Sequence, residues 1–159
     1  MFNFLKKKEK FSLVSPVSGD LINLDKVEDQ VFSSKAMGDG FAVIPTEKTL
    51  YSPINGKVKM VFPTKHAICF QLNNGQDVIV HVGIDTVELN GEGFSVFVKE
   101  GDTVKQGQKI IELSEKIFND SNINLVTMVV LLETSDMNLP RFDKFIKQGE
   151  GVIKNDTCY

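Results

Sequence analysis

The segment HAICFQLNNGQDVIVHVG, residues 66–83, decides the fold that the sequence predicts. Two runs of β-branched and aromatic residues flank the Asn-Asn-Gly triplet at 73–75, a pattern typical of a β-hairpin. We predict a four-residue loop that pairs Leu72 with Asp77.

The hairpin contains the only two histidines of the chain, His66 and His81, one on each strand. In the predicted register Ile68 lies opposite His81, and His66 lies opposite Gly83. Directly opposed residues point to one side of a sheet, so the two imidazoles become diagonal neighbours. A loop one residue shorter or longer would place them on opposite faces. Under this register Gly83, without a side chain, leaves room for a group that approaches the pair.

Short alternating runs bounded by Gly, Pro, Asn and Asp predict further strands along the chain. Helical stretches are predicted only at 114–118 and 139–147. Many short strands separated by turns are typical of an all-β fold, an antiparallel β-sandwich or partly closed barrel with a few short helical turns. The predicted strands are 11–17, 19–24, 40–45, 56–62, 66–72, 76–82, 94–98, 108–113 and 126–133.

A shared Ser-Pro-aliphatic-x-Gly-x-aliphatic pattern at 15–24 and 52–61 indicates two similar halves, and coincidence is the alternative for so short a match.

Composition predicts one globular domain. The chain has 159 residues, of which 42% are hydrophobic and 25% charged, and these values are ordinary for a soluble domain. A net charge of −3 argues against nucleic acid as the main partner. We predict a flexible N-terminal segment at 1–11 and a single domain at 12–159. Cys69 and Cys158 are interpreted as free thiols in a reducing cytosol.

No targeting or membrane-spanning segment is predicted. The start, MFNFLKKKEK, lacks the apolar stretch of a signal peptide, and LVTMVVLLE at 125–133 is too short to span a bilayer. We therefore expect a cytoplasmic protein. The basic and aromatic start would make at most a weak peripheral membrane contact, and a solvated segment is the alternative.

The histidine pair suits phosphoryl transfer. A histidine with an unperturbed pKa of about 6.5 is mostly neutral in the cytosol, so one ring nitrogen has a lone pair that can attack phosphorus. His66 would donate an N–H to a phosphoryl oxygen, and Thr64 would hold that ring in the required tautomer. Two ordinary structural histidines remain the alternative. Apolar neighbours that would surround the pair are Val31, Phe32, Phe62, Ile79 and Val87.

The segment GQDVIVHVGIDTVELNGEGF, residues 75–94, resembles the phosphorylation-site signature of the glucose-type enzyme IIA family of the bacterial phosphoenolpyruvate-dependent sugar phosphotransferase system. The glycine, the aliphatics before and after the histidine, the second glycine and the threonine all match that signature. Further similarity lies in SPVSGDLINL, VFSSKAMGDGFAVIP, PTKHA and VKEGDTVKQGQKI, so the resemblance covers residues 12–133.

The resemblance implies a phosphotransferase component that works through a phosphohistidine. His81 would accept a phosphoryl group from the histidine phosphocarrier HPr and pass it to an enzyme IIB domain of a sugar permease. His66 resembles the family's second active-site histidine, and Thr64 its hydrogen-bonding threonine. Asp29 and Asp85 resemble acidic residues that flank the family's site and face basic groups of a partner. The segment before Phe11 is shorter, and the end of the chain is truncated, compared with family members.

Three other hypotheses are compatible with parts of the sequence. A biotinyl or lipoyl carrier domain shares turns such as EGDTVKQGQKI, but Lys59-Met60 lies inside a predicted strand instead of at a hairpin tip. A regulator that binds transporters or metabolic enzymes is compatible with phosphoryl carriage. We predict no cofactor and no intrinsic metal, because His66 and His81 supply two ligands and would need a partner's carboxylate to hold zinc.

Overall fold

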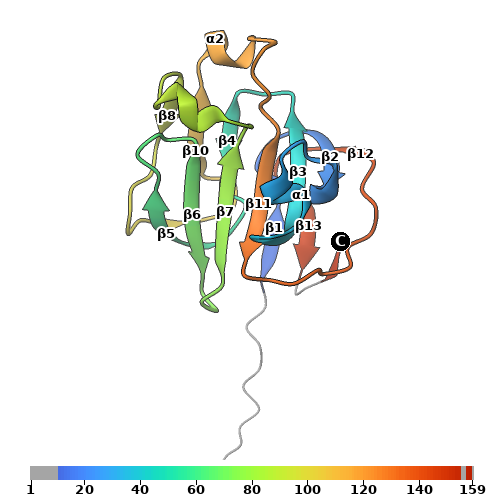
Figure 1. The fold of residues 1–159 in the computed structure, drawn as a ribbon. Helices are drawn as coiled ribbons and strands as arrows, with labels where there is room; N and C mark the ends of the chain where they lie inside the picture. Colours follow the sequence, from blue (N-terminus) through green and yellow to red (C-terminus); the bar gives the residue numbers. More distant parts are fainter. Residues whose placement is uncertain (1–10, 155–156, 159) are drawn as a thin grey trace, which may run out of the picture.

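An eight-stranded antiparallel sheet forms one layer of the protein in the computed structural model, which describes residues 11–154 and 157–158 (Figure 1). Its strand order is β12-β2-β3-β11-β7-β6-β5-β9. Within the described residues the sheet ends at β12 and β9 and does not close into a barrel. Its strands are β2 (Gly19–Asn23), β3 (Gly38–Pro45), β5 (Gly56–Val61), β6 (Ala67–Leu72), β7 (Asp77–Val82), β9 (Thr103–Val104), β11 (Thr127–Leu132) and β12 (Lys144–Ile146).

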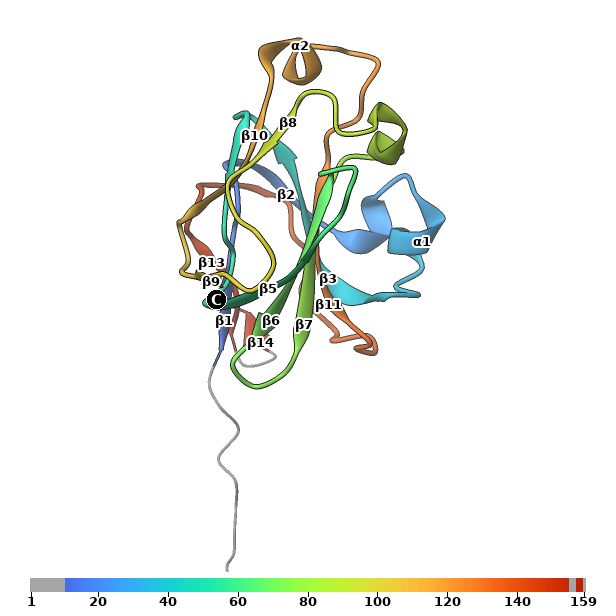
Figure 2. The ribbon, with the colours of Figure 1, turned by 90° about the vertical axis from the view of Figure 1, so that its left-hand side faces the viewer.

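Two three-stranded sheets, ordered β4-β10-β8 and β1-β13-β14, complete the second layer. Figure 2 shows β10 and β13 on one side of the molecule, β3 and β11 in the middle, and a short helix, α1, on the other side. The predicted antiparallel β architecture is confirmed. The strands of this layer are β1 (Ser12–Val14), β4 (Thr49–Tyr51), β8 (Phe94–Val96), β10 (Lys109–Leu113), β13 (Gly151–Lys154) and β14 (Thr157–Cys158).

Alternation along the strands divides the apolar side chains between two clusters. On β7, Val78, Val80 and Val82 are fully buried in the main core between the layers, whereas Ile79 belongs to a second cluster on the outer face of the large sheet. The second cluster lies beneath α1 and a 3₁₀ turn, η1. The outer face of the large sheet is therefore covered in part, and His81 lies beside this cover. The members of the second cluster are Leu24, Val27, Phe32, Ala42, Ala67, Ile79, Val126, Met128 and Val130.

The helical elements are all short. The predicted helix at 114–118 is confirmed as α2 (Glu115–Phe118), whose cap Ser114 accepts a hydrogen bond from Ile117 N (3.2 Å). The sequence did not predict α1 (Gln30–Ser33), which is too short for helical periodicity to reveal. The 3₁₀ turns are η1 (Leu24–Lys26) and η2 (Thr86–Leu89).

The predicted helix at 139–147 is wrong. The side chain of Asn23 donates to Pro140 O (2.9 Å) and accepts from Phe142 N (2.8 Å), which holds this segment in an extended conformation. The segment then enters β12, which pairs with β2. Tertiary hydrogen bonds have overridden the helical propensity of the segment.

Each of the two Ser-Pro segments forms a turn, and the two turns have the same hydrogen bond from the serine hydroxyl to the carbonyl two residues later. Ser15 Oγ donates to Val17 O (2.7 Å), and Ser52 Oγ donates to Ile54 O (2.8 Å). The two turns also exchange backbone hydrogen bonds, so the repeated pattern is a repeated structure. These bonds run from Val14 N to Pro53 O (3.0 Å) and from Tyr51 N to Pro16 O (2.9 Å).

Several predictions concern the ends of the chain and its thiols. Most of the predicted flexible segment, residues 1–10, lies outside the described residues, and Phe11 contacts the main core. Cys69 is a buried free thiol on β6, and the side chain of Cys158 is not described. Among the described residues, no helix is long and apolar enough to cross a membrane.

Candidate active site

His81 lies near the end of β7, on the outer face of the large sheet. Its neighbours across the sheet are Ala67 on β6 and Met128 on β11. Both neighbours are fully buried and apolar, so the imidazole lies on an apolar floor. The His81 side chain itself remains partly exposed.

His66 lies directly before β6, at the end of a tight turn. Lys65 adopts a left-handed φ of 62°, and its N–H donates to Phe62 O (2.8 Å). Phe62 N in turn donates to Ala67 O (3.0 Å). This turn brings the His66 ring to 4.7 Å from the His81 ring between centroids, with the two planes nearly perpendicular at 85°. The two imidazoles therefore share one small site.

The predicted register of the hairpin is wrong by one residue. Ala67, not Ile68, pairs with His81, because the loop comprises residues 72–76 and is one residue longer than predicted. The expectation that such a shift would separate the histidines is also wrong. His66 precedes the regular strand, so the turn before β6, not strand alternation, decides which way its ring points.

Gly83 does not lie opposite His66 and has a different role from the predicted one. It ends the strand with a φ of 82°, in the left-handed region that glycine adopts without strain. A Cβ at this position would lie 2.4 Å from Thr86 Cγ2 and 2.8 Å from Asn124 O. Glycine is required because the turn after His81 is packed tightly.

Thr64 contacts the ring of His66 through its hydroxyl group. Its Oγ1 lies 2.8 Å from Nδ1 of His66. When the threonine hydroxyl donates to Nδ1, the ring proton resides on Nε2, which can then donate to a group bound beside His81. Thr64 can therefore select the tautomer of His66.

Both histidines are held in the neutral form. Burial and, to a smaller extent, the nearby His66 lower the pKa of His81 to about 4, against opposing effects of the Gly83 backbone and of Asp29. Burial also lowers the pKa of His66, which is opposed by the Thr64 backbone. At neutral pH each ring thus has one protonated nitrogen and one lone pair.

Aromatic side chains from two separate segments contact the pair, and two exposed valines lie close to them or to His81 in sequence. The Phe32 ring, on α1, lies 4.9 Å from the His81 ring, and the Phe62 ring lies 5.7 Å from the His66 ring. Val31 and Val87 are 51% and 48% exposed, although both are apolar. We call these four residues the apolar rim. Ile79, also predicted for partner binding, is buried and belongs to the floor.

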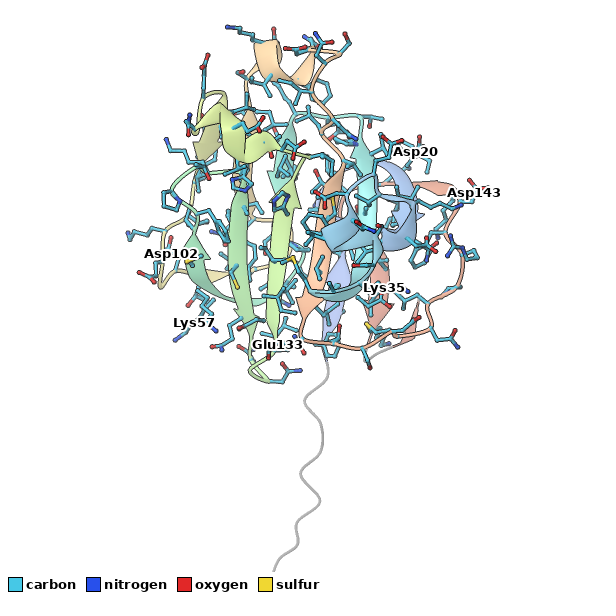
Figure 3. The ribbon with its side chains drawn as sticks, in the orientation of Figure 1. Asp20, Lys35, Lys57, Asp102, Glu133 and Asp143 are labelled. Carbon is cyan, nitrogen blue, oxygen red and sulfur yellow. The ribbon has the colours of Figure 1, made fainter. Side chains whose placement is uncertain are left out.

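Carboxylates lie beside the apolar rim. Asp29 caps α1, where it accepts a hydrogen bond from the helix backbone (2.9 Å). Asp85 is exposed, with a left-handed φ of 58°, and borders a pocket of about 380 Å³ that Glu28 and Glu88 also line. Glu28 and Glu88 were not predicted, although each lies close in sequence to a predicted residue. Other labelled charged residues, such as Lys57, Asp102 and Asp143, lie at the periphery in Figure 3.

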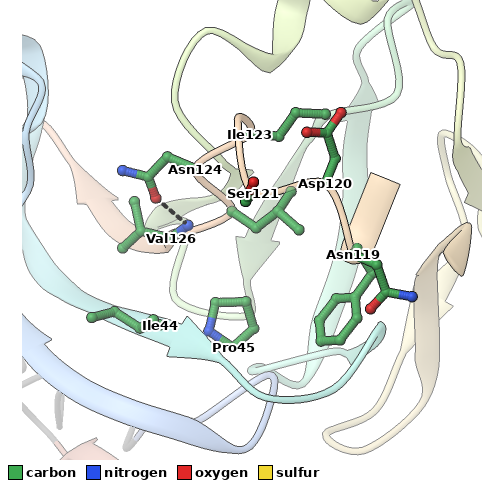
Figure 4. A pocket seen from close by; sticks show the side chains of 10 residues that line it. Ile44, Pro45, Asn119, Asp120, Ser121, Ile123, Asn124 and Val126 are labelled. Carbon is green, nitrogen blue, oxygen red and sulfur yellow. Dashed lines mark hydrogen bonds between the residues drawn. The ribbon is translucent and has the colours of Figure 1, made fainter. Parts of the chain in front are cut away.

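Two further pockets among the described residues are not lined by the histidines. The pocket in Figure 4, of about 300 Å³, lies between the end of β3 and the segment at 119–126. A third pocket, of about 520 Å³, is lined by residues of the β6–β7 loop and by Met37 and Glu133. His66 is only 4% exposed and His81 is partly exposed, so the pair lies just beneath the surface of the outer face of the large sheet.

The described residues were also considered as metal ligands. Across residues 11–154, no group of three or more His, Cys, Asp or Glu side chains is placed to hold an ion. The histidines supply two nitrogen ligands, fewer than a stable zinc site uses.

Comparisons with known proteins agree with this geometry. A family model described as "phosphoenolpyruvate-dependent sugar phosphotransferase system, EIIA 1" matches residues 11–137. The glucose-specific EIIA component of Borreliella burgdorferi is 35% identical over 157 residues, which cover 99% of this chain and 80% of that protein. The solved structure of glucose permease IIA from Mycoplasma capricolum superposes with a TM-score of 0.79 at 30% identity, covering 97% of this chain and 99% of that one.

Some relatives are much longer. The N-acetylglucosamine-specific EIICBA component of Klebsiella pneumoniae is 44% identical over 125 residues, or 79% of this chain. That match covers 19% of the longer protein, so the chain spans about a fifth of such relatives.

Proposed function

Since the chain belongs to the EIIA 1 family of the phosphoenolpyruvate-dependent sugar phosphotransferase system, we propose that it carries a phosphoryl group on His81 during sugar uptake. The observation that supports this most directly is the pair of neutral imidazoles 4.7 Å apart within an apolar rim. A neutral imidazole is a nucleophile, and an adjacent imidazole N–H can stabilise the charge of the transferred group.

The attacking atom of His81 is Nε2. Nδ1 is buried and makes no hydrogen bond among the described residues, so an incoming phosphorus atom cannot reach it. The Nε2 lone pair forms the new N–P bond as the bond to the donor's histidine nitrogen breaks, and the electron pair of that bond stays on the donor. The His81 ring becomes cationic with its Nδ1 proton retained, and the donor ring, cationic while phosphorylated, leaves as a neutral imidazole that keeps its own N–H. The protein contributes mainly position and charge stabilisation.

His66 and Thr64 are proposed to stabilise the phosphoryl group. With the Thr64 hydroxyl donating to Nδ1 of His66, Nε2–H of His66 donates to a phosphoryl oxygen. The apolar rim strengthens this hydrogen bond, because it excludes water from the site.

The proposed donor is HPr and the proposed acceptor is an enzyme IIB domain. Val31, Phe32, Phe62 and Val87 offer a partner an apolar contact around the reacting nitrogen, above the buried Ile79. Asp29 and Asp85 are placed to pair with basic groups of a partner. The names of long relatives join EIIA to EIIB and EIIC portions, which agrees with an enzyme IIB acceptor. We place the protein in the cytoplasm, where these partners would meet it.

A regulatory role is compatible with the same surface. A phosphoryl group would add negative charge at the centre of the apolar rim, so a regulatory target could distinguish the two forms. Pull-downs with phosphorylated and unmodified protein would test this: equal recovery of every partner by both forms would exclude it.

Intact mass after incubation with phosphoenolpyruvate, enzyme I and HPr tests the proposal. We expect one added phosphoryl group that is lost in acid, stable in base and absent from His81→Ala. Normal phosphorylation of a folded His81→Ala variant would contradict the assignment of His81. No added mass on the folded wild-type protein would reject the carrier function.

A further inference from the structure

Helix α1 supplies two residues of the apolar rim, Val31 and Phe32, although it comprises only four residues. Of its side chains, only that of Phe32 joins the second apolar cluster beneath it. A single helical turn is not stable in water by itself, because few hydrogen bonds offset the loss of backbone freedom. Further contacts must therefore hold α1 beside His81.

Lys35 is the residue at which the chain leaves α1 and turns toward β3. Its N–H donates to Phe32 O (3.0 Å), and its carbonyl accepts from Gly38 N (3.2 Å). Its φ of 59° lies in the left-handed region, where helices commonly end on a glycine. This conformation is costly for a lysine, which indicates that the side chain contributes something that glycine cannot.

The ammonium of Lys35 lies between two carboxylates from different segments. Its Nζ is 3.6 Å from Asp39, at the start of β3, and 3.2 Å from Asp136, in the connection between β11 and β12. In the view of Figure 3, Lys35 lies directly below α1. The lysine therefore joins the end of α1 to a strand of the large sheet and to the segment that leaves β11.

Asp39 gives this contact a fixed point. Its side chain is only 2% exposed, and its two oxygens accept hydrogen bonds from Gly40 N (2.8 Å) and Met137 N (2.8 Å). A buried carboxylate is costly unless a positive charge lies close to it, and Lys35 supplies that charge. Because both oxygens of Asp39 are held by backbone groups, the ammonium ties the end of α1 to a rigid part of the molecule.

We propose that Lys35 is a positioning residue for phosphoryl transfer, whose ammonium fixes the end of α1 and so keeps Phe32 against His81. The same anchor holds Val31 at the apolar rim. This inference rests on the proposed carrier function. Without the ammonium, α1 would adopt several orientations, and only the fraction in the orientation described above would bind phospho-HPr productively. Lys35 therefore acts on the docking of the partner and not on the chemical step.

The test compares Lys35→Met, which keeps the aliphatic stem and removes the charge, with Lys35→Arg, which keeps the charge. In the unmodified protein, the nuclear Overhauser effect between ring protons of Phe32 and His81 reports the position of α1, because the ring centroids are 4.9 Å apart. We expect this effect in the wild type and in Lys35→Arg, and a much weaker effect in Lys35→Met.

Single-turnover phosphorylation at increasing concentrations of phospho-HPr separates docking from chemistry. The half-saturating concentration should rise about fivefold in Lys35→Met, the effect of losing a partly exposed ion pair, and return to the wild-type value in Lys35→Arg. The maximal rate should stay at the wild-type value in both variants, because the reacting groups are unchanged.

Lys59→Met is the matched control. Lys59 also pairs with an aspartate of the large sheet, with its Nζ 2.6 Å from Asp77, but this pair joins β5 to β7 and not to α1. The substitution changes the net charge by the same amount, so it also controls for long-range attraction between the two proteins. It should leave the contact between Phe32 and His81 and the half-saturating concentration unchanged.

Asp136→Asn is a second probe, which leaves the buried carboxylate of Asp39 paired with Lys35. The Asp136 side chain is 68% exposed, so this substitution removes one contact of the ammonium without disturbing the core. The half-saturating concentration should rise about twofold. If Lys35→Met does not fold, this variant decides: wild-type behaviour of Asp136→Asn would then overturn the role of Lys35.

The outcomes separate this inference from the proposed function. A folded Lys35→Met variant with the wild-type ring contact, or an equal rise in half-saturating concentration in Lys59→Met, would overturn the role of Lys35. A lower maximal rate at an unchanged half-saturating concentration would also overturn it, because Lys35 would then act on the chemical step. Absence of any phosphorylation of the wild-type protein rejects the carrier function, whereas the ring contact still decides whether Lys35 positions α1.

Discussion

The Nδ1 atoms of the two imidazoles have different surroundings, and this difference predicts different roles for the two residues. His66 has its Nδ1 against Thr64 at 2.8 Å, whereas Nδ1 of His81 is buried without such a side chain. A ring whose tautomer is set by a hydroxyl is suited to donate a hydrogen bond. A ring with a free Nε2 lone pair is suited to attack.

We expect His66→Gln to accept a phosphoryl group on His81 but to pass it on slowly. Glutamine can still donate a hydrogen bond, but it lacks the geometry of the ring during transfer. Transfer to an enzyme IIB domain should slow on the order of 100-fold, measured by loss of labelled phosphate from the protein. A His66→Gln protein that transfers at the wild-type rate would remove His66 from the mechanism.

The depressed pKa of His81 predicts a loss of stability in acid. Its pKa is about 4 in the folded protein and about 6.5 in the unfolded chain, so between these values the unfolded chain binds the proton more strongly. Stability is fully present above pH 6.5 and falls by up to about 3 kcal/mol as the pH falls toward 4. The free energy of urea unfolding is measured for the wild type and for His81→Asn across this pH range. The difference between the two pH profiles gives the contribution of His81, because the carboxylates titrate in both proteins. Parallel pH profiles for the two proteins would contradict it.

At the scale of elements, the sequence predicted the hairpin but not its register. Alternation and the Asn-Asn-Gly triplet identify β6, β7 and a loop between them. The length of the loop depends on the hydrogen bond from Leu72 N to Gln76 O (2.8 Å). This backbone bond cannot be predicted from the types of the residues in the loop. The histidines meet because of the left-handed Lys65, a conformation that lysine rarely adopts.

The other errors have the same origin. The segment at 139–147 has a helical pattern, yet the side chain of Asn23, more than 100 residues away in sequence, holds it extended. Helix α1 has only four residues, and its cap Asp29 was noticed only for its charge. The signature around His81 predicted a site at this histidine, and the structure brings the His66 ring to 4.7 Å from the His81 ring between centroids. Contacts between distant segments were not visible in a single sequence.

Gly83 offers a prediction for the turn after β7. Gly83→Ala should destabilise the protein by about 3 kcal/mol or more, because the new Cβ meets both Thr86 and a backbone oxygen. Gly75→Ala is the matched control: its φ of 90° is equally unfavourable for alanine, but no atom lies within 4 Å of the new Cβ. That variant should lose only about 1 kcal/mol. Chemical denaturation measures both, and equal losses would show that backbone conformation alone explains the glycine.

At the scale of the whole molecule, exposed apolar residues occur both near the histidines and at other places on the surface. Val31 is 51% exposed beside His81, and Ile44 is 46% exposed at the far end of β3. Only the first belongs to the apolar rim. Substitutions at Val31 and at Ile44 can therefore distinguish a loss of partner docking from a general effect of a changed apolar surface.

We expect Val31→Asp to slow phosphorylation by phospho-HPr about tenfold or more, because it puts a charge where an apolar contact forms. The folded protein should be as stable as the wild type, since the side chain lies at the surface. Ile44→Asp should change neither rate nor stability. Equal rates for the two variants would place the docking surface elsewhere.

The second apolar cluster has a consequence for motion. Helix α1 has four residues and joins this small cluster, outside the main sandwich, only through Phe32, so its amide protons should exchange with deuterium far faster than those of β7. If amide exchange in α1 and in β7 gave the same free energy of opening, α1 would open only when the whole protein unfolds. If α1 opens on its own, the Phe32 ring uncovers His81 while the sheets stay intact. The nucleophile would then be shielded in the resting protein by a local unfolding equilibrium that an arriving partner can shift.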